Sequence, residues 1–236
     1  MQVSQAMIAV AAIFTMLTIS SANPGSGSVN GRVTLDGTPT KPRMIDMSTE
    51  PSCAKQHAKP VAAENVVTGP DSALENVVVF LSAGAPDEPP PTEPAVLTQK
   101  GCRYSPHILA FQVNQDFEIV NEDQTSHNIH PLPSSNREWN KLQPPGAAPI
   151  EDKYARPEFI PIKCNIHPWM KGTLAVMKNS HFAITADDGE FKLPNLPPGS
   201  YTITAWHESY GEHSQEVIVT GSESKTVNFV FKAGSY

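Results

Sequence analysis

One short stretch of the chain combines three side chains that bind soft metal ions. In KCNIHPWMKG, residues 163–172, Cys164, His167 and Met170 follow one another at intervals of three residues. A further histidine, His127, precedes them in EDQTSHNIHP. A thiolate, two imidazoles and a weakly bound thioether are the ligands of copper electron-transfer sites, in which the thiolate and thioether favour Cu(I). These four residues therefore predict a mononuclear copper site.

Separate strands must hold such ligands at fixed positions. His127 follows FEIVN, residues 117–121, and the other three candidates follow FIPIKC, residues 159–164. Both segments have the composition of strands. If the two strand ends lie at the same pole of a β-sandwich, they bring the four side chains together. Zinc could instead occupy the Cys-His₂ set with a water molecule, but methionine is a poor zinc ligand.

The two motifs together resemble those of cupredoxins. The patterns are N-x-D-x-x-x-H-N-x-H at 121–130 and C-x-x-H-P-x-M at 164–170, and the latter spacing looks like the short ligand loop of amicyanins. The resemblance spans roughly residues 95–178, although the proline-rich segment 131–158 departs from it. It implies a Greek-key β-sandwich with one type 1 (blue) copper ion, bound by His127, Cys164, His167 and Met170.

The resemblance gives Asn128 a role, and the loop itself suggests roles for three further residues. Asn128 matches the residue that steadies the cysteine loop by hydrogen bonding. His167 is expected to be the partly exposed ligand through which an electron enters or leaves. Pro168 and Trp169 beside it are candidates for an apolar docking patch. The alternative for Trp169 is an inward position in which it shields the copper ion.

The three cysteines give information about the cellular compartment of the protein. In an oxidising compartment two of them would pair, and the third would be reactive or metal-bound. Cys164 lies among potential ligands, whereas Cys53 and Cys102 lie in turn-like contexts. We therefore hypothesise a Cys53–Cys102 disulfide.

The N-terminal residues 1–22 are typical of a secretory signal peptide. An apolar run from Ala6 to Ile19 is followed by small residues at Ser20 and Ala22, which predicts cleavage near Ala22. No Lys or Arg precedes the run, so an uncleaved N-terminal anchor remains the alternative. We expect a periplasmic or secreted protein that has no membrane attachment after cleavage.

Composition and two further motifs predict an all-β chain with a second sandwich. The 236 residues include 23 prolines and 14 glycines, and charged residues make up 17%. GSVNGRVTLDG and DDGEFKLPNLPPGSYTITAWHE resemble pieces of the bacterial carboxypeptidase regulatory-like domain, a transthyretin-like β-sandwich. We expect its parts at 28–84 and 179–236 and the cupredoxin-like part at 95–178, with the proline-dense segment 85–94 as a boundary. Either the copper domain is inserted between two halves of one sandwich, or the domains stand in tandem.

These observations favour an exported copper protein that carries single electrons between periplasmic redox partners, for which a c-type cytochrome is a candidate. An enzyme is not expected, because further copper ions would need additional histidine clusters or a second nearby cysteine. The net charge of −7 and the lack of a basic cluster argue against nucleic acid as a partner. The alternatives are a copper-sequestering protein and a structural surface protein without a redox partner.

Overall fold

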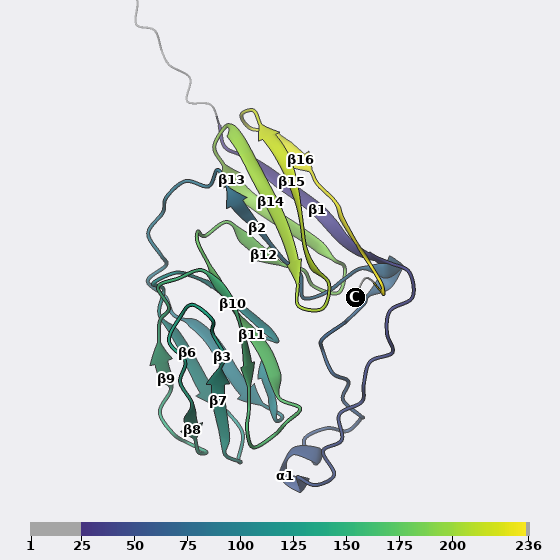
Figure 1. Ribbon diagram of the computed structural model, residues 1–236, viewed down its shortest axis with the longest axis vertical. Coiled ribbons are helices and arrows are strands. Elements are labelled where there is room, and N and C mark those ends of the chain that lie inside the picture. Colours follow the sequence, from purple (N-terminus) through teal and green to yellow (C-terminus); the bar gives the residue numbers. More distant parts are fainter. Residues whose placement is uncertain (1–24, 235–236) are drawn as a thin grey trace, which may run out of the picture.

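The computed structural model describes residues 25–234, which form two β-sandwiches joined by several segments (Figure 1). The predicted signal peptide at 1–22 lies outside the described residues. Within residues 25–234, no helix is both long enough and apolar enough to span a membrane. The all-β prediction is confirmed.

The flanking sandwich is built from both ends of the described chain. Its first sheet has the order β13 (Glu190–Leu196), β1 (Gly27–Asp36) and β16 (Ser224–Thr226), and β17 (Phe229–Lys232) also pairs with β1. Its second sheet has the order β12 (Phe182–Ile184), β2 (Val78–Ala83), β14 (Gly199–His207) and β15 (Gly211–Val219). Alternating apolar residues of both sheets, including Val33, Leu81 and Ile203, form one buried core.

The inserted sandwich is built from the middle of the chain. One sheet has the order β4 (Arg103–Ser105), β3 (Ala95–Lys100), β6 (Phe117–Asn121) and β9 (Ile150–Asp152). The other has the order β5 (Ile108–Gln112), β11 (Lys171–Met177), β10 (Glu158–Lys163), β7 (His127–Pro131) and β8 (Lys141–Gln143). These strands enclose a second, separate core.

The strand order shows that the flanking sandwich is divided along the chain by the inserted sandwich. β1 and β2 precede the inserted sandwich in the chain, yet β1 pairs with β13 and β2 pairs with β12 and β14, which all follow it. β3 to β11 therefore lie between the two halves of the flanking sandwich. The proline-dense segment 85–94 is the first crossing between them and contains no strand.

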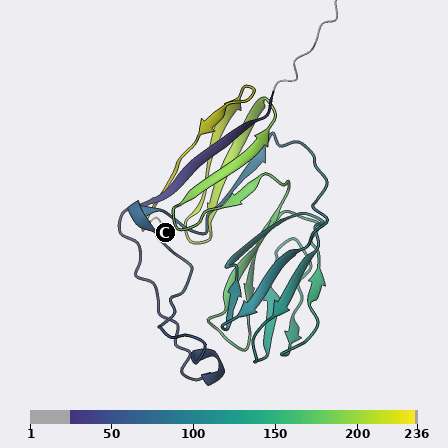
Figure 2. The ribbon, with the colours of Figure 1, turned by 180° about the vertical axis from the view of Figure 1, so that it is seen from behind.

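A long connection between β1 and β2 reaches across to the inserted sandwich. We call residues 43–63 of this connection the strap. At its tip is the single-turn helix α1 (Pro51–Ala54), and the 3-10 turn η1 (Pro70–Ser72) follows it in the chain. In both views the strap runs alongside the inserted sandwich with α1 at the far end (Figures 1 and 2). Met47 and Cys53 are buried in the core of the inserted sandwich, so the strap is part of that core.

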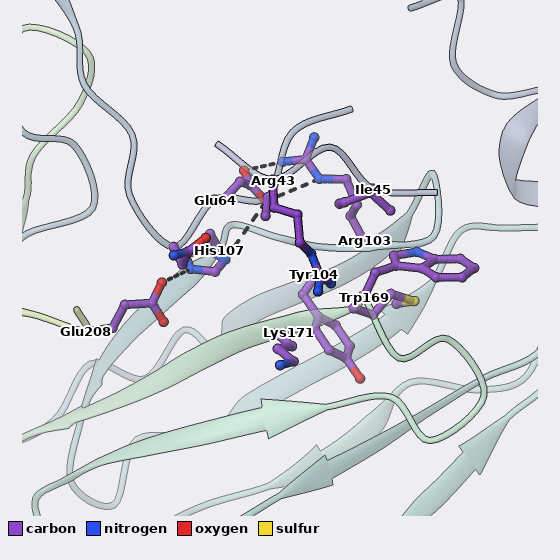
Figure 3. Close-up of a pocket in the computed structure, with 12 residues that line it drawn as sticks. Arg43, Ile45, Glu64, Arg103, Tyr104, His107, Trp169, Lys171 and Glu208 are labelled. Carbon is purple, nitrogen blue, oxygen red and sulfur yellow. Dashed lines mark hydrogen bonds and ion pairs between the residues drawn. The ribbon is translucent and has the colours of Figure 1, made fainter. Parts of the chain in front are cut away.

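The two sandwiches share a small interface of aromatic and aliphatic side chains. The rings of Phe159 and Trp206 stack with their centroids 3.9 Å apart, and Val78, Ile108 and Met177 are buried beside them. At the edge of this interface His107 Nε2 lies 2.6 Å from Glu208 Oε1, and Glu64 of the connection lies 3.9 Å from His107 Nδ1 (Figure 3). The pKa of His107 is raised, because its interactions with Glu208 and Glu64 outweigh the opposing effect of burial.

The ion pair between His107 and Glu208 should make the stability of the chain depend on pH. A raised pKa means that the pair contributes fully below the unfolded-state pKa, about 6.5, and that the contribution is lost as the pH rises through the folded-state pKa. Glu208→Gln should therefore lower the free energy of unfolding by about 1–2 kcal/mol near pH 5.5 and by less near pH 8.5. Urea unfolding at both pH values measures this, with Glu212→Gln as the control. An equal loss at both pH values would contradict the prediction.

Candidate metal centre

The structure brings all four predicted ligands to one pole of the inserted sandwich. His127 is the first residue of β7, Cys164 directly follows β10, and Met170 directly precedes β11. β10 runs antiparallel to both β7 and β11, and its last residue, Lys163, pairs with His130, so the loop that follows β10 runs back alongside the start of β7. The side chains of all four, His127, Cys164, His167 and Met170, are at most 2% exposed.

Three donor atoms converge on a common point. His127 Nδ1 lies 3.0 Å from His167 Nδ1, which lies 3.8 Å from Cys164 Sγ. The three ligand atoms all lie within 4.8 Å of one another. Because metal–imidazole bonds are about 2.0 Å and metal–thiolate bonds about 2.3 Å, one ion can reach all three atoms. The donor set therefore fits a metal ion that accepts two imidazoles and a thiolate.

The sulfur of Cys164 is held by hydrogen bonds from the backbone. The N–H groups of Asn128 and His167 point at Sγ, at 3.5 and 3.4 Å. Burial alone would raise the pKa of the Cys164 thiol, but hydrogen bonds from His127 and from these backbone groups outweigh it and lower the pKa. A lowered pKa favours the thiolate, which is the form that binds metals.

Asn128 fixes the ligand loop to β7. Its Oδ1 accepts from the backbone N–H of Asn165 at 2.6 Å and lies 3.3 Å from Cys164 Sγ. Its Nδ2 donates to Asn140 Oδ1. The side chain thus connects the start of β7 with the loop, which is the position that the sequence motif suggested for it.

Met170 closes the loop through its backbone. Its carbonyl accepts from the N–H of Cys164 at 3.1 Å, and its own N–H donates to His167 O at 2.9 Å. The side chain is buried in the same apolar cluster as Cys164. The short spacing of the motif therefore produces a tight turn in which Cys164 and Met170 lie beside each other.

Asp123, which was not among the residues predicted from the sequence, orients His127. Asp123 Oδ2 lies 2.8 Å from His127 Nε2, so this nitrogen carries the proton and Nδ1 presents its lone pair to His167. Asp123 also accepts the backbone N–H groups of Gly101 and Cys102, at 2.7 and 2.8 Å. Burial opposes ionisation, but these hydrogen bonds outweigh it and lower the pKa of Asp123. The N-x-D pattern before His127 was the signal that could have indicated this role.

The expectation that His167 is partly exposed is wrong, because the imidazole is only 1% exposed. Cys53 and Cys102 form a disulfide, and Cys164 is free and buried. Cys53 Sγ lies 3.7 Å from His167 Nε2, so the strap and its disulfide cover the edge of the ring. Burial lowers the pKa of His167, and His127 lowers it further because the two neighbouring imidazoles would repel each other if both were protonated.

The two residues of the predicted docking patch differ in position. Pro168 is exposed, whereas Trp169 is half-buried, with its indole N–H donating to Cys102 O at 3.0 Å. The ring of Trp169 lies against His167, with centroids 5.2 Å apart, so the inward alternative describes it better. Ile166, 43% exposed, is the other apolar side chain that the loop presents to solvent. His130 pairs with Glu138 at 2.7 Å and is not among the converging ligands.

Comparisons with known proteins agree with the two-part organisation. A family model of the carboxypeptidase regulatory-like domain matches residues 173–232, which contain the later strands of the flanking sandwich. β1 and β2 lie outside this match because the inserted sandwich separates them from it in the chain. None of the curated proteins matches the chain.

Several solved structures are similar to part of the chain. A purple cupredoxin from Nitrosopumilus maritimus is 20% identical with a TM-score of 0.31, and the match covers 35% of this chain and 99% of that one. The reduced state of an amicyanin mutant is 17% identical with a TM-score of 0.33, covering 42% and 98%. A copper-containing nitrite reductase from Thermus scotoductus SA-01 is 21% identical with a TM-score of 0.35, covering 42% of this chain but only 25% of the reductase.

The hydrogen bond from His127 to Asp123 should matter for metal affinity. Asp123→Asn removes the carboxylate that holds Nε2–H and keeps a side chain of the same size. We expect the affinity for copper to fall by about 10- to 100-fold, as for other partners that orient ligand histidines. Competition with a chromophoric copper chelator measures the affinity. Glu122→Gln, which removes the partly exposed neighbour paired with Lys100, is the matched control and should leave the affinity unchanged.

Proposed function

We propose that this chain is an exported mononuclear type 1 copper protein that carries single electrons between periplasmic redox partners, and that it is a carrier rather than an enzyme. The observation that supports this most directly is the convergence of His127 Nδ1, His167 Nδ1 and Cys164 Sγ in a buried site beside Met170. Two imidazoles, one thiolate and a thioether form the donor set of copper electron-transfer centres.

The residues around the site hold this donor set in place. When bound, copper would supply one-electron chemistry by alternating between Cu(I) and Cu(II). Asp123 fixes the ring of His127, and Asn128 fixes the loop that carries Cys164. Because these contacts do not involve the metal, the ligands are positioned before it binds. A site that is preorganised in this way needs little rearrangement when the charge of the ion changes.

Two observations support export. The N-terminal sequence has the pattern of a signal peptide. Cys53 and Cys102 form a disulfide, a bond that persists in oxidising compartments and is rare in the cytosol. We therefore propose a periplasmic or secreted location.

The burial of His167 favours a second candidate function, copper sequestration. Electron exchange through a ligand imidazole requires a partner to approach its edge, and here the strap covers that edge. A covered site holds its ion away from solvent and from chelators. A sequestering protein would have the same ligands and no redox partner.

The copper site can be tested by its colour. Adding Cu(II) to the purified mature protein should produce an intense visible thiolate-to-copper absorption band, which Cys164→Ser should lack because it removes the thiolate. The control is Cys53→Ser/Cys102→Ser, which retains Cys164 and should still give the band. A colourless wild-type protein would overturn the proposal and leave a structural β-sandwich protein.

The two candidate functions differ in their electron-transfer rates. If the chain is a carrier, its Cu(II) form should be reduced by a soluble c-type cytochrome at a rate that is first order in each protein. Stopped-flow absorption of the copper band and of the haem measures this rate. A blue protein that the cytochrome does not reduce, but that a small inorganic reductant does, would favour sequestration.

A further inference from the structure

A second group of soft ligands lies directly beside the candidate copper site. Cys53, Cys102 and His167 each offer a ligand atom, and these atoms all lie within 4.8 Å of one another. Both cysteines are fully buried. In the structure they are joined as a disulfide, which cannot bind a metal ion through thiolates. Reduction of this bond would place two thiols next to the copper ligands.

The ring of His167 separates the two groups. Its Nδ1 faces His127 at 3.0 Å, whereas its Nε2 faces Cys53 Sγ at 3.7 Å. The first site uses Nδ1, so an ion there leaves Nε2–H directed at the sulfur of Cys53. An N–H group can donate a hydrogen bond to a sulfur atom. The disulfide is therefore placed where its reduced form would find a hydrogen-bond donor.

We propose that reduction of the Cys53–Cys102 disulfide creates a second copper site, which binds one Cu(I) ion through the two thiolates beside His167. The inference rests on the proposed copper function, because it makes this dithiol a place where the chain receives or stores additional copper. Thiolates select soft ions such as Cu(I). Zinc would need four ligands in a tetrahedron, and the carboxylate of Asp123 beside Cys102 is already engaged by His127 and two backbone N–H groups.

A protein dithiol can supply the electrons and protons that reduction of the disulfide requires. The disulfide takes two electrons and two protons from an exported protein dithiol, which becomes a disulfide itself, and Cys53 and Cys102 become thiols. Cu(I) then displaces both thiol protons and is bound by two sulfur atoms. Oxidation of the two thiols by an external disulfide would reverse the process and release the ion.

The strap that carries Cys53 lines one side of a cavity, and the ligand loop lines another. Its two arms are joined by backbone hydrogen bonds from Ile45 to Val61 and from Ala63 to Arg43. His57 Nε2 contacts Gly101 O at 2.8 Å. On its inner side is a cavity of about 390 Å³ (Figure 3), lined by Arg43 and Ile45 of the strap and by Trp169 and Met170 of the ligand loop. Trp169, which lines this cavity, donates its indole N–H to Cys102 O, so a single side chain separates the cavity from the disulfide.

The experiment measures how many Cu(I) ions the chain binds before and after reduction. The mature protein is treated without oxygen with a water-soluble phosphine, desalted, assayed for thiols and titrated with Cu(I) in competition with a chromophoric chelator. The chain has three cysteines, so reduction should raise the thiol count from one to three. We expect one tightly bound Cu(I) before reduction and two after it. Cys53→Ser/Cys102→Ser should bind one under either condition.

Other results would overturn the inference. These are a disulfide that the phosphine does not reduce in the folded chain, a reduced chain that still binds one Cu(I), or a second equivalent that Zn(II) fills equally well. Cys164→Ser separates this inference from the proposed function: the variant should lack the blue band and yet bind one Cu(I) only after reduction. If the serine pair does not fold, mass spectrometry of the reduced wild type replaces it, because bound Cu(I) should protect Cys53 and Cys102 from alkylation.

Discussion

The buried carboxylate of Asp123 connects the parts of this structure that otherwise come from distant segments. It is 3% exposed and accepts hydrogen bonds from His127 and from the backbone of Gly101 and Cys102. Gly101 and Cys102 both have positive φ, as a two-residue hairpin turn of type I′ requires. One carboxylate thus holds a metal ligand, the turn between β3 and β4 and, through Cys102, the disulfide. A buried charge is tolerated only when it is satisfied in this way.

The disulfide extends this connection to the flanking sandwich. It joins residues separated by 49 positions, and the chain-entropy argument gives such a cross-link about 4 kcal/mol of stabilisation. The strap that it fixes leaves β1 and returns to β2, so both halves of the connection are tied to the core of the inserted sandwich. Together with the stacking of Phe159 on Trp206, this cross-link limits the freedom of one sandwich relative to the other.

The features that could be predicted from the sequence involve residues that are close together along the chain or that share a motif. The fold class and the loop from Cys164 to Met170 follow from strand patterns and spacing, since both depend on local periodicity. Asp123 and the burial of His167 could not be predicted in this way. Each depends on a residue pair from separate segments, Asp123 with the turn at Gly101 and His167 with Cys53. Residues 41–72 look irregular in sequence because the strap is held by tertiary contacts and a disulfide rather than by regular strands.

The cover over His167 has two opposing consequences for a copper site. Excluding water from the ligands lowers the local dielectric constant and keeps the ion away from competing ligands, so it changes the reduction potential and slows metal loss. The same cover would keep a redox partner from the edge of the imidazole, so in the proposed carrier electrons would pass through the strap or through the exposed side of the loop at Ile166 and Pro168. The disulfide ties the strap to the turn between β3 and β4, so its reduction would remove one of the bonds that hold this cover in place. The disulfide of the strap and the ligand loop are in direct contact, through the 3.7 Å approach of Cys53 Sγ to His167 Nε2 and the hydrogen bond from Trp169 to Cys102 O.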